Sequence, residues 1–275
     1  MDSDAANEAV RDAIRKAAGA AGELSLRDAE RIATEACLLL RHIERAALEE
    51  GIVPRRYARN VPSLGADGQR RLLGCCAGVM GLGGLGGCAV ECLARLGVGR
   101  IVGVDPDAIA ESNLNRQLLA TTESVGLSKA DQARLRVARI NPAVEFAAHA
   151  VDFRQLPEGT LAGCDVILDC LDSIPARREL ARRSAAAGVV LVHAAIAGWC
   201  GQLAVCPPGS DLLEKLYAGG KRGIEGRLGN LPFTAAVAAN WMAARAAALL
   251  LGRIEPREEL VFFDLLAGEW ETVEP

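Results

Sequence analysis

A glycine-rich segment is the first feature of this sequence that could bind and orient a reactive group. Residues 81–87 read Gly-Leu-Gly-Gly-Leu-Gly-Gly, follow a short apolar run and open a helix-like segment. This placement points backbone N–H donors and the positive end of a helix dipole at a phosphate. Asp105 ends the next apolar run about 20 residues later, where an acidic side chain commonly binds ribose hydroxyls. The nucleotide-binding residues predicted from this part are Gly81, Gly83, Gly84, Gly86 and Asp105.

Charged residues beyond Asp105 help to decide between NAD and ATP. Arg116 and Lys129 follow the acid within one segment. Hydride transfer to NAD needs no cation there, because glycine backbone binds the pyrophosphate. Nucleotidyl transfer accumulates charge on the phosphates, and fixed cations together with a metal ion stabilise that charge. These residues therefore favour ATP, although each cation taken alone is also typical of an ordinary surface.

An acidic residue at the end of a later apolar run is the candidate metal ligand. Residues 165–172 read Asp-Val-Ile-Leu-Asp-Cys-Leu-Asp, and Ser173 follows. The ligand-binding crevice of an open parallel sheet lies at the carboxyl ends of its strands, so Asp172 is placed to hold magnesium there. The competing interpretation is a helix cap, since Pro175 suits the first turn of a helix.

The elements that would position these residues alternate between strands and helices. We expect strands at residues 73–80, 100–105, 146–151, 165–172, 189–197 and 201–205, and helices up to 96, at 129–140 and at 234–251. This order predicts the α/β class, with a Rossmann-like domain whose mainly parallel sheet is extended by further strands. We assign residues 54–275 to this domain.

Residues 1–53 are predicted to form a separate N-terminal helical extension. Ser25 and Asp28 stand at capping-box spacing before a helix. The apolar positions expected on one helical face are Ile32, Ala36, Leu39, Leu40 and Ile43. We expect that face to pack on the main domain or at a dimer interface, and we assign it no catalytic role.

Composition excludes several classes of protein. About half of the 275 residues are hydrophobic and the formal net charge is −4, which suits a folded domain and makes nucleic acid an unlikely partner. The acidic start has no signal-peptide pattern, so we expect a cytoplasmic protein. Polar residues and glycine interrupt the apolar stretches 185–206 and 234–252, which favours burial over a membrane span. The nine cysteines form no C-x-x-C pair, so we expect no structural zinc site.

Several motifs in order make the chain resemble the ThiF/MoeB/HesA family, the bacterial relatives of ubiquitin-activating enzymes. The resemblance extends from about residue 56 to residue 252. The matching segments are Arg56-Tyr57-Ala-Arg59, Gly68-Gln69, Leu72, residues 81–86, Asp105, Asp107, residues 112–117, Val125-Gly126, Lys129, residues 140–142 and Asp169-Cys-Leu-Asp172.

The resemblance implies an adenylyltransferase that acts as a homodimer. Each subunit would bind MgATP and adenylate the C-terminal glycine of a small ubiquitin-like sulfur carrier ending in Gly-Gly, with release of pyrophosphate. A sulfur donor protein would then act on the adenylate. By likeness, Gly84 and its neighbours bind phosphate, Asp105 the ribose, Asn113, Arg116 and Lys129 the triphosphate, Asp172 the magnesium, and Arg59 the partner subunit's ATP. Ser112 and Ser173 complete the predicted nucleotide-binding set.

The chain also departs from this family. Many members carry two C-x-x-C pairs for structural zinc, whereas residues 207–228 contain no cysteine. Cys200 and Cys206 are poor candidates for a covalent bond to a carrier, so the predicted product is the adenylate. Asn60, Ser173 and residues 229–232 differ from the residues usual there. Residues 219–223 would form either a clamp over a carrier tail or an ordinary solvated loop.

Other functions remain open at the level of sequence. The same ATP site would serve a different carboxylate acceptor, such as a modified tRNA base or a peptide. A nicotinamide-dependent oxidoreductase would explain residues 81–105 and leave Arg116, Lys129 and Asp172 without a role. A non-catalytic nucleotide-binding scaffold is the third alternative.

Overall fold

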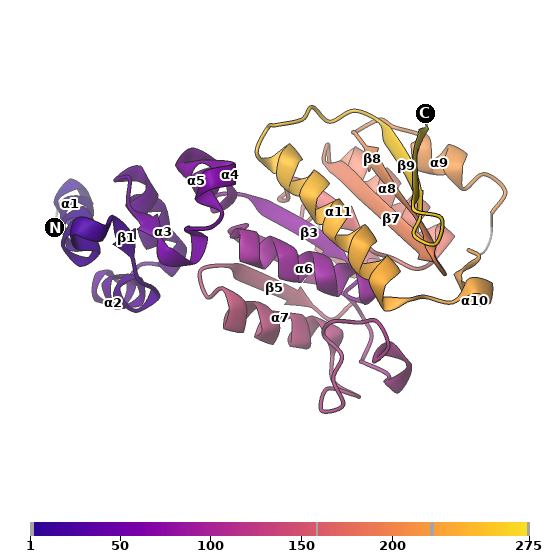
Figure 1. The fold of residues 1–275 in the computed structure, drawn as a ribbon, viewed down its shortest axis with the longest axis horizontal. Helices are drawn as coiled ribbons and strands as arrows, with labels where there is room; N and C mark the ends of the chain where they lie inside the picture. Colours follow the sequence, from indigo (N-terminus) through magenta and orange to yellow (C-terminus); the bar gives the residue numbers. More distant parts are fainter. Residues whose placement is uncertain (1–2, 158, 221–222, 274–275) are drawn as a thin grey trace.

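A large mixed sheet forms the centre of the computed structural model, which describes residues 3–157, 159–220 and 223–273 (Figure 1). The eight strands of this sheet stand in the order β10-β9-β8-β7-β6-β3-β4-β5. Parallel strands are β3 (Cys76–Met80), β4 (Arg100–Val104), β5 (Glu145–His149), β6 (Val166–Asp169) and β7 (Val190–Ala197). Antiparallel strands are β8 (Cys200–Cys206), β9 (Glu259–Asp264) and β10 (Glu269–Val273). This is the predicted α/β class, with a parallel sheet extended by further strands.

Helices cover both faces of the sheet (Figure 1). One face packs against α6 (Gly84–Leu96), α7 (Lys129–Ile140) and α11 (Pro232–Leu250) in the larger apolar core. The other packs against α8 (Ile174–Ala186) and α9 (Leu212–Leu216). The short α10 (Glu225–Leu228) precedes α11. Among the described helices, α11 alone is long and apolar enough to cross a membrane, and its buried face packs on α6 and β7 as a core helix does.

The position of β3 determines where a ligand can bind. Its neighbours are β4 on one side and β6 on the other, so successive connections leave the sheet in opposite directions at this point. The connections separate at the carboxyl ends of these strands and open a crevice, which is the usual binding position in open α/β sheets. The loops that carry the predicted site residues follow β3, β4 and β6.

Several element boundaries differ from the prediction. The run 165–172, expected to be a strand throughout, ends as a strand at Asp169, because the chain then leaves the sheet as a loop. The hairpin of β9 and β10 was not predicted at all. By contrast, α7 spans the residues predicted for it, since Ser128 caps its first turn and Asn141-Pro142 ends it.

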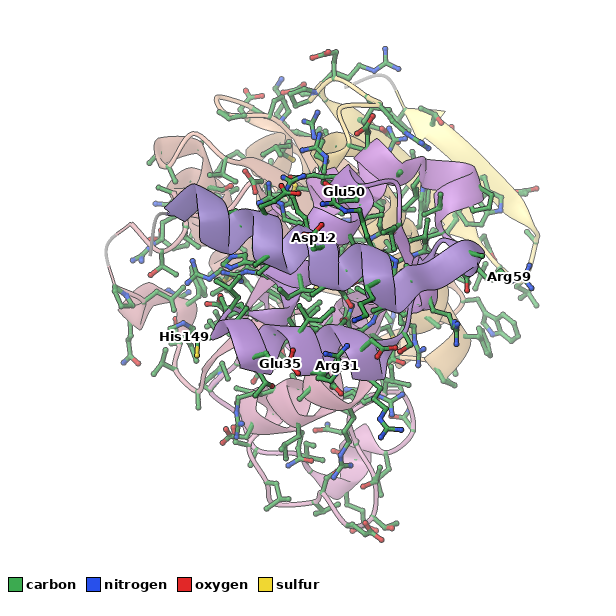
Figure 2. All side chains as sticks on the ribbon, turned by 90° about the vertical axis from the view of Figure 1, so that its left-hand side faces the viewer. Asp12, Arg31, Glu35, Glu50, Arg59 and His149 are labelled. Carbon is green, nitrogen blue, oxygen red and sulfur yellow. The ribbon has the colours of Figure 1, made fainter. Side chains whose placement is uncertain are left out.

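The N-terminal residues form a small unit with its own core. Its elements are α1 (Ser3–Ala18), the 3-10 turn Gly19–Ala21, β1 (Glu23–Leu24), α2 (Leu26–Ala36), α3 (Leu40–Glu49) and β2 (Val53–Pro54). Arg15 of α1 joins this helix to the end of α3 by pairing with Glu50 at 2.6 Å, and it also pairs with Asp12 of its own helix at 2.6 Å. Figure 2 labels Asp12 and Glu50. Ser25 caps α2 as predicted and accepts the Asp28 N–H at 3.1 Å. The boundary at residue 53 stays a prediction.

The expected single apolar face is wrong. The chain turns at Cys37, whose φ is 53°, so the residues before and after it belong to different helices. Leu39 is 55% exposed, whereas Ile32 and Ile43 are buried in the core of the unit. Periodicity alone did not reveal the break, because the apolar spacing continues through the turn.

A buried polar cluster joins this unit to the rest of the chain. Glu44 of α3 is 1% exposed, and its Oε1 lies 3.2 Å from Nε of Arg56. Arg56 also donates to the Asn141 side chain, whose Nδ2 donates to the Tyr57 hydroxyl at 2.9 Å. Burial raises the pKa of Glu44 to about 7, against the opposing effect of Arg56. The segment that follows includes the 3-10 turn Arg55–Tyr57, α4 (Val61–Leu64) and α5 (Ala66–Leu72).

Glu44 should make stability depend on pH. Its pKa rises from 4.5 unfolded to about 7 folded, so between these values the native state binds the proton that the unfolded state releases. The free energy of unfolding should therefore fall as pH rises through this window, by on the order of 3 kcal/mol, and then level off. Urea denaturation across pH should show this slope in the wild type and lose it in Glu44→Gln.

The matched control is Glu49→Gln, since Glu49 lies on the exposed side of the same helix. That variant should keep the slope of the wild type. Parallel curves for Glu44→Gln and the wild type would show that Glu44 does not carry the effect.

Candidate functional site

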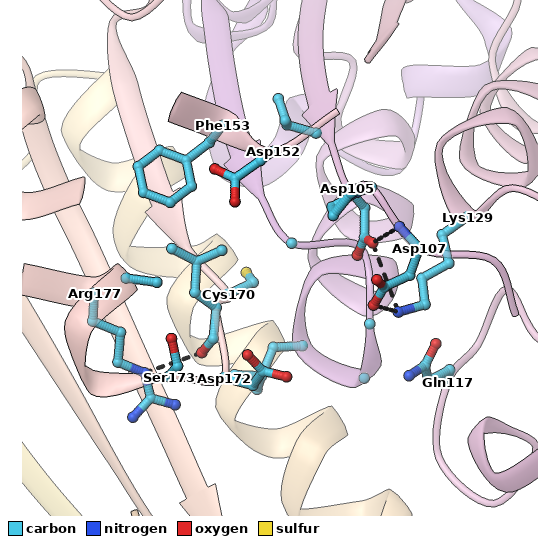
Figure 3. Close-up of a pocket in the computed structure, with 18 of the residues that line it drawn as sticks. Asp105, Asp107, Gln117, Lys129, Asp152, Phe153, Cys170, Asp172, Ser173 and Arg177 are labelled. Atoms are coloured by element: carbon cyan, nitrogen blue, oxygen red, sulfur yellow. Dashed lines mark hydrogen bonds and ion pairs between the residues drawn. The ribbon is translucent and has the colours of Figure 1, made fainter. Parts of the chain in front are cut away.

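A cavity of about 350 Å³ opens at the carboxyl ends of β3, β4 and β6 (Figure 3). Its volume lies in the range typical of small-molecule sites. Eight predicted site residues from separate segments line it: Gly81, Gly83, Gly84, Asp105, Arg116, Lys129, Asp172 and Ser173. The fold therefore brings together most of the chemistry proposed from the sequence.

The glycine loop adopts a conformation that side chains would block. Gly81 has φ of 92°, and a Cβ there would lie 2.6 Å from the Cys170 carbonyl oxygen. Gly86 does not line the cavity; a Cβ on it would overlap the carbonyl oxygen of Gly81. Gly83 is the N-cap of α6 and has no side chain to cover the first N–H groups of the helix. These groups can donate to an anion in the cavity.

Asp105 holds the glycine loop in place. Its carboxylate accepts the Leu82 N–H at 2.7 Å and the Asp107 N–H at 2.9 Å. The residue is 5% exposed, and burial raises its pKa against the effect of these two hydrogen bonds and Lys129. Each carboxylate oxygen has two lone pairs, so Asp105 can support the loop and still accept ribose hydroxyls.

Lys129 is the first residue of α7 and projects into the same wall. Its Nζ lies 2.8 Å from Asp107 Oδ2 and 3.7 Å from Asp105 Oδ1, and the side chain is 8% exposed. Two carboxylates thus face one ammonium group. This wall is net negative, so other donors must supply most of the attraction for a triphosphate.

Arg116 reaches the cavity from the turn after the 3-10 helix Glu111–Asn113. Its Nη1 donates to the Ser112 carbonyl at 3.1 Å and to Asn115 Oδ1 at 2.8 Å. Ser112 and Asn113 do not line the cavity; Asn113 Oδ1 accepts the Ala110 N–H at 3.1 Å and shapes the turn. Their direct contact with a nucleotide stays a prediction.

Gln117 is a cavity residue that the sequence analysis did not select. It is 7% exposed, and its Oε1 has no hydrogen-bond partner in the described part of the chain. A buried unpaired acceptor beside Gly83 is costly unless a ligand or water donates to it. The other lining residues missed include Arg154, and Asp152, Phe153 and Arg177, which Figure 3 labels.

Asp172 lies on the loop after β6. It is exposed, and its carboxylate has no partner among the described residues. Ser173, not Asp172, occupies the N-cap position of α8, and its side chain makes no cap bond. Within the described ranges no three His, Cys, Asp or Glu side chains converge on a metal site. This donor set suits magnesium shared with phosphate oxygens, which commonly needs only one or two carboxylates.

Arg59 and the two cysteines considered above do not line the cavity. Arg59 is exposed and lies on the side of the molecule that carries the N-terminal helices (Figure 2). Cys200 is exposed and Cys206 is buried, and burial raises the pKa of both thiols, that of Cys206 to about 12. Neither is therefore activated as a thiolate. Of the predicted loop 219–223, residues 221 and 222 lie outside the described residues.

Comparison with known proteins gives the family of this chain. Residues 57–275 match the ThiF family. The chain belongs to the ThiF family. The ThiF-family chain is 35% identical over 230 residues to the SAMP-activating enzyme E1 of Haloferax volcanii, covering 79% of this chain and 84% of that protein. It is 35% identical over 156 residues to the sulfur carrier protein ThiS adenylyltransferase of Escherichia coli, covering 56% of this chain and 62% of the relative.

Solved structures confirm the fold class. E. coli MccB crystallised with ATP superposes with a TM-score of 0.64 at 20% identity, over 79% of this chain and 71% of that one. PaaA superposes with a TM-score of 0.66 at 18% identity, over 80% and 72% of the two chains. The predicted family and Rossmann-like fold are therefore confirmed, and the names of the sequence relatives agree with the predicted adenylyltransferase.

The packing of Gly86 gives a test of the loop. Gly86→Ala should weaken ATP binding at least about tenfold, because relieving an overlap with backbone costs roughly 1–3 kcal/mol. The neighbouring Gly87→Ala should cost much less, since its Cβ would lie 3.2 Å from the Leu119 side chain and 3.8 Å from the Leu82 carbonyl oxygen, with no overlap with backbone. Calorimetric titration with MgATP compares the two. Equal affinities would show that the loop does not require this close packing.

Proposed function

We propose that this protein activates the C-terminal glycine carboxylate of a small ubiquitin-like sulfur carrier as an acyl-adenylate, with release of pyrophosphate. The observation that carries the proposal is the convergence of the glycine loop, Asp105, Arg116, Lys129 and Asp172 on one cavity in a chain of the ThiF family. Relatives of this chain are named for activating SAMP and for adenylating ThiS.

The reaction makes limited chemical demands on the protein. A carboxylate oxygen attacks the α-phosphorus of ATP, the new O–P bond forms, and the bond to pyrophosphate breaks. The carboxylate is already ionised, so no general base is needed. The protein must align the two anions and stabilise charge that spreads over the phosphates. Backbone N–H groups at the start of α6, Arg116 and Lys129 are suited to this role.

Magnesium is part of the proposal. The ion would neutralise phosphate charge, and Asp172 with its free carboxylate would hold it, while Ser173 lies beside it at the rim. The net negative wall of Asp105, Asp107 and Lys129 supports the need for an added cation.

The proposed assembly is a homodimer in the cytoplasm. Arg59 does not line the cavity of its own chain, so any action on ATP would have to be on the partner subunit's nucleotide. A fixed arginine of this kind stabilises spreading phosphate charge. A sulfur donor protein would then consume the adenylate.

The acceptor is the least constrained part of the proposal. A peptide carboxylate or a modified tRNA base would react at the same ATP site. The likeness to MccB, whose crystals include one with AMPCPP and MccA, concerns the fold alone at 19% identity. The acceptor therefore has to be identified by experiment.

Exchange of labelled pyrophosphate into ATP tests the function directly. Purified protein with Mg²⁺ should catalyse exchange only when a Gly-Gly-ending carrier is present, because the reverse reaction needs the acyl-adenylate. A carrier lacking its final glycine is the control and should not support exchange. ATP binding without exchange for any carrier would move the function to another acceptor or to a scaffold, and binding of NAD instead of ATP would contradict the proposal altogether.

Arg116 and Lys129 should each be required for the exchange reaction. Arg116→Ala and Lys129→Ala should each reduce the rate of exchange at least about a hundredfold, the scale for losing one preorganised donor. Arg134→Ala, at an exposed position of the same helix as Lys129, is the matched control and should leave the rate near normal. Near-normal exchange in both of the first two variants would rule out this cavity as the site of reaction.

A further inference from the structure

A buried set of polar side chains lies behind the loop that follows β6, and the proposed reaction makes no direct use of it. Asp169 at the end of β6 and His193 on β7 are fully buried, and Arg177 on α8 is 6% exposed. Tyr217 joins them from the end of α9. Residues from four elements thus meet in one small volume, where an unpaired polar atom would be costly.

Hydrogen bonds connect these side chains in a closed ring. Asp169 Oδ2 lies 2.8 Å from His193 Nδ1, and His193 Nε2 lies 2.8 Å from the Tyr217 hydroxyl. Arg177 donates from Nη1 to that hydroxyl and from Nε to the Leu171 carbonyl, both at 3.0 Å. The Leu171 N–H donates to Asp169 Oδ1 at 3.0 Å and closes the ring. We call these five residues the Leu171 ring.

The donors and acceptors of the ring admit one arrangement of protons. Burial lowers the pKa of His193, so its imidazole is neutral at neutral pH. A carboxylate can only accept, so the single N–H is on Nδ1 facing Asp169, and Nε2 accepts from Tyr217. The tyrosine hydroxyl donates once and accepts twice, from Arg177 and from Gln202 Nε2 at 2.7 Å. The Tyr217 hydroxyl thus makes all three of its hydrogen bonds, and it connects His193 to Arg177.

The ring holds the backbone next to the predicted magnesium ligand. Both polar backbone groups of Leu171 are bound by ring side chains, and Asp172 comes next in the chain. Figure 3 shows Arg177 reaching this loop beside Asp172 and Ser173. Asp172 is exposed and unpaired within the described chain, so its own contacts do not fix its position.

We propose that the Leu171 ring positions Asp172 for the reaction, with the Tyr217 hydroxyl as its required link. This inference rests on the proposed function. Outer hydrogen bonds that orient a metal ligand commonly contribute 10- to 100-fold to metal affinity. The ring members act through Asp172 and are positioning residues.

Tyr217 also makes this positioning depend on a distant segment. It ends α9, which lies between β8 and α11, whereas the other ring members lie between residues 169 and 193. Leu212 and Leu213 bury the apolar side of α9 in the core. The ring closes only when α9 is docked, so the docking of this segment and the position of Asp172 are coupled.

The test separates the ring from general packing. Tyr217→Phe deletes the hydroxyl and keeps the aromatic ring of the side chain. Calorimetry measures the affinity for a non-hydrolysable ATP analogue over a series of Mg²⁺ concentrations and without Mg²⁺. The Mg²⁺ concentration for half-maximal tightening should rise about tenfold, while the affinity without Mg²⁺ stays within about twofold.

Ser184→Ala is the matched control. It deletes the buried hydroxyl of Ser184 on α8, which donates to the Val189 carbonyl at 2.7 Å outside the ring. It should lower stability and leave the Mg²⁺ dependence unchanged. An unchanged dependence in Tyr217→Phe, or an equal shift in both variants, would overturn the proposal. The analogue binds without an acceptor, so a failure of the carrier reaction leaves this test interpretable.

The protons of the ring give an independent readout. The chain has 3 histidines, and ¹⁵N NMR of their side chains, with His193→Gln to assign the signal, reports the tautomer of His193. We expect the neutral Nδ1–H form in the wild type and a changed Nε2 shift in Tyr217→Phe, since that nitrogen loses its donor at 2.8 Å and keeps only Gln202 Nε2 at 3.4 Å. A charged imidazole or an Nε2–H tautomer in the wild type would contradict the ring.

Discussion

The close approach of two backbone loops is the constraint on which the rest of this site depends. Gly81 follows β3 and Cys170 follows β6, and these strands are adjacent and parallel, so both loops leave the same edge of the sheet. The space between them admits no side chain on Gly81, and Gly86 packs as tightly from inside α6. The glycines therefore do more than expose N–H groups to phosphate. They join the phosphate-binding turn to the loop of Asp172, so that one movement would displace both.

Charge balance explains why the cations of the cavity come from separate elements. Asp105 accepts the Leu82 N–H of the glycine loop, so its negative charge is a fixed part of the cavity wall. With Asp107 it outweighs Lys129, which leaves that wall negative. Attraction for a polyanion must then come from the other cations of the lining, Arg116, Arg154 and Arg177, and from the start of α6. A site of this composition holds a nucleotide well only when cations and backbone donors act together, which agrees with a reaction that needs positioning and charge stabilisation more than proton transfer.

The sequence predicted the bounds of an element best where residues a few positions away determine them. The bounds of α7 follow from Ser128 and from Asn141-Pro142, which act within a few residues. The apolar pattern alone extended the strand before Asp172 too far, because the apolar residues Cys170 and Leu171 continue the pattern after β6 has ended. Gln117 and Asp152 were missed for another reason. Gln117 reaches the cavity because of the turn after Asn113, and Asp152 reaches it because β5 lies beside β4. A pattern of neighbouring residues contains no information about this arrangement in space.

Two buried polar clusters share one physical logic at different places in the fold. One cluster holds the segment just before Arg59 and consists of Glu44, Arg56, Tyr57 and Asn141. The other is the Leu171 ring, which holds the loop just before Asp172. In both cases the side chain proposed to act on ATP is exposed. Unlike Lys129, which pairs with Asp107, the side chains of Arg59 and Asp172 have no charged partner among the described residues, so contacts of their own do not hold them. Their positions have to come from neighbouring segments of the chain. Buried hydrogen bonds hold that segment in the Leu171 ring, whereas the cluster at Glu44 leaves Glu44 Oε2 and Arg56 Nη2 without a partner among the described residues.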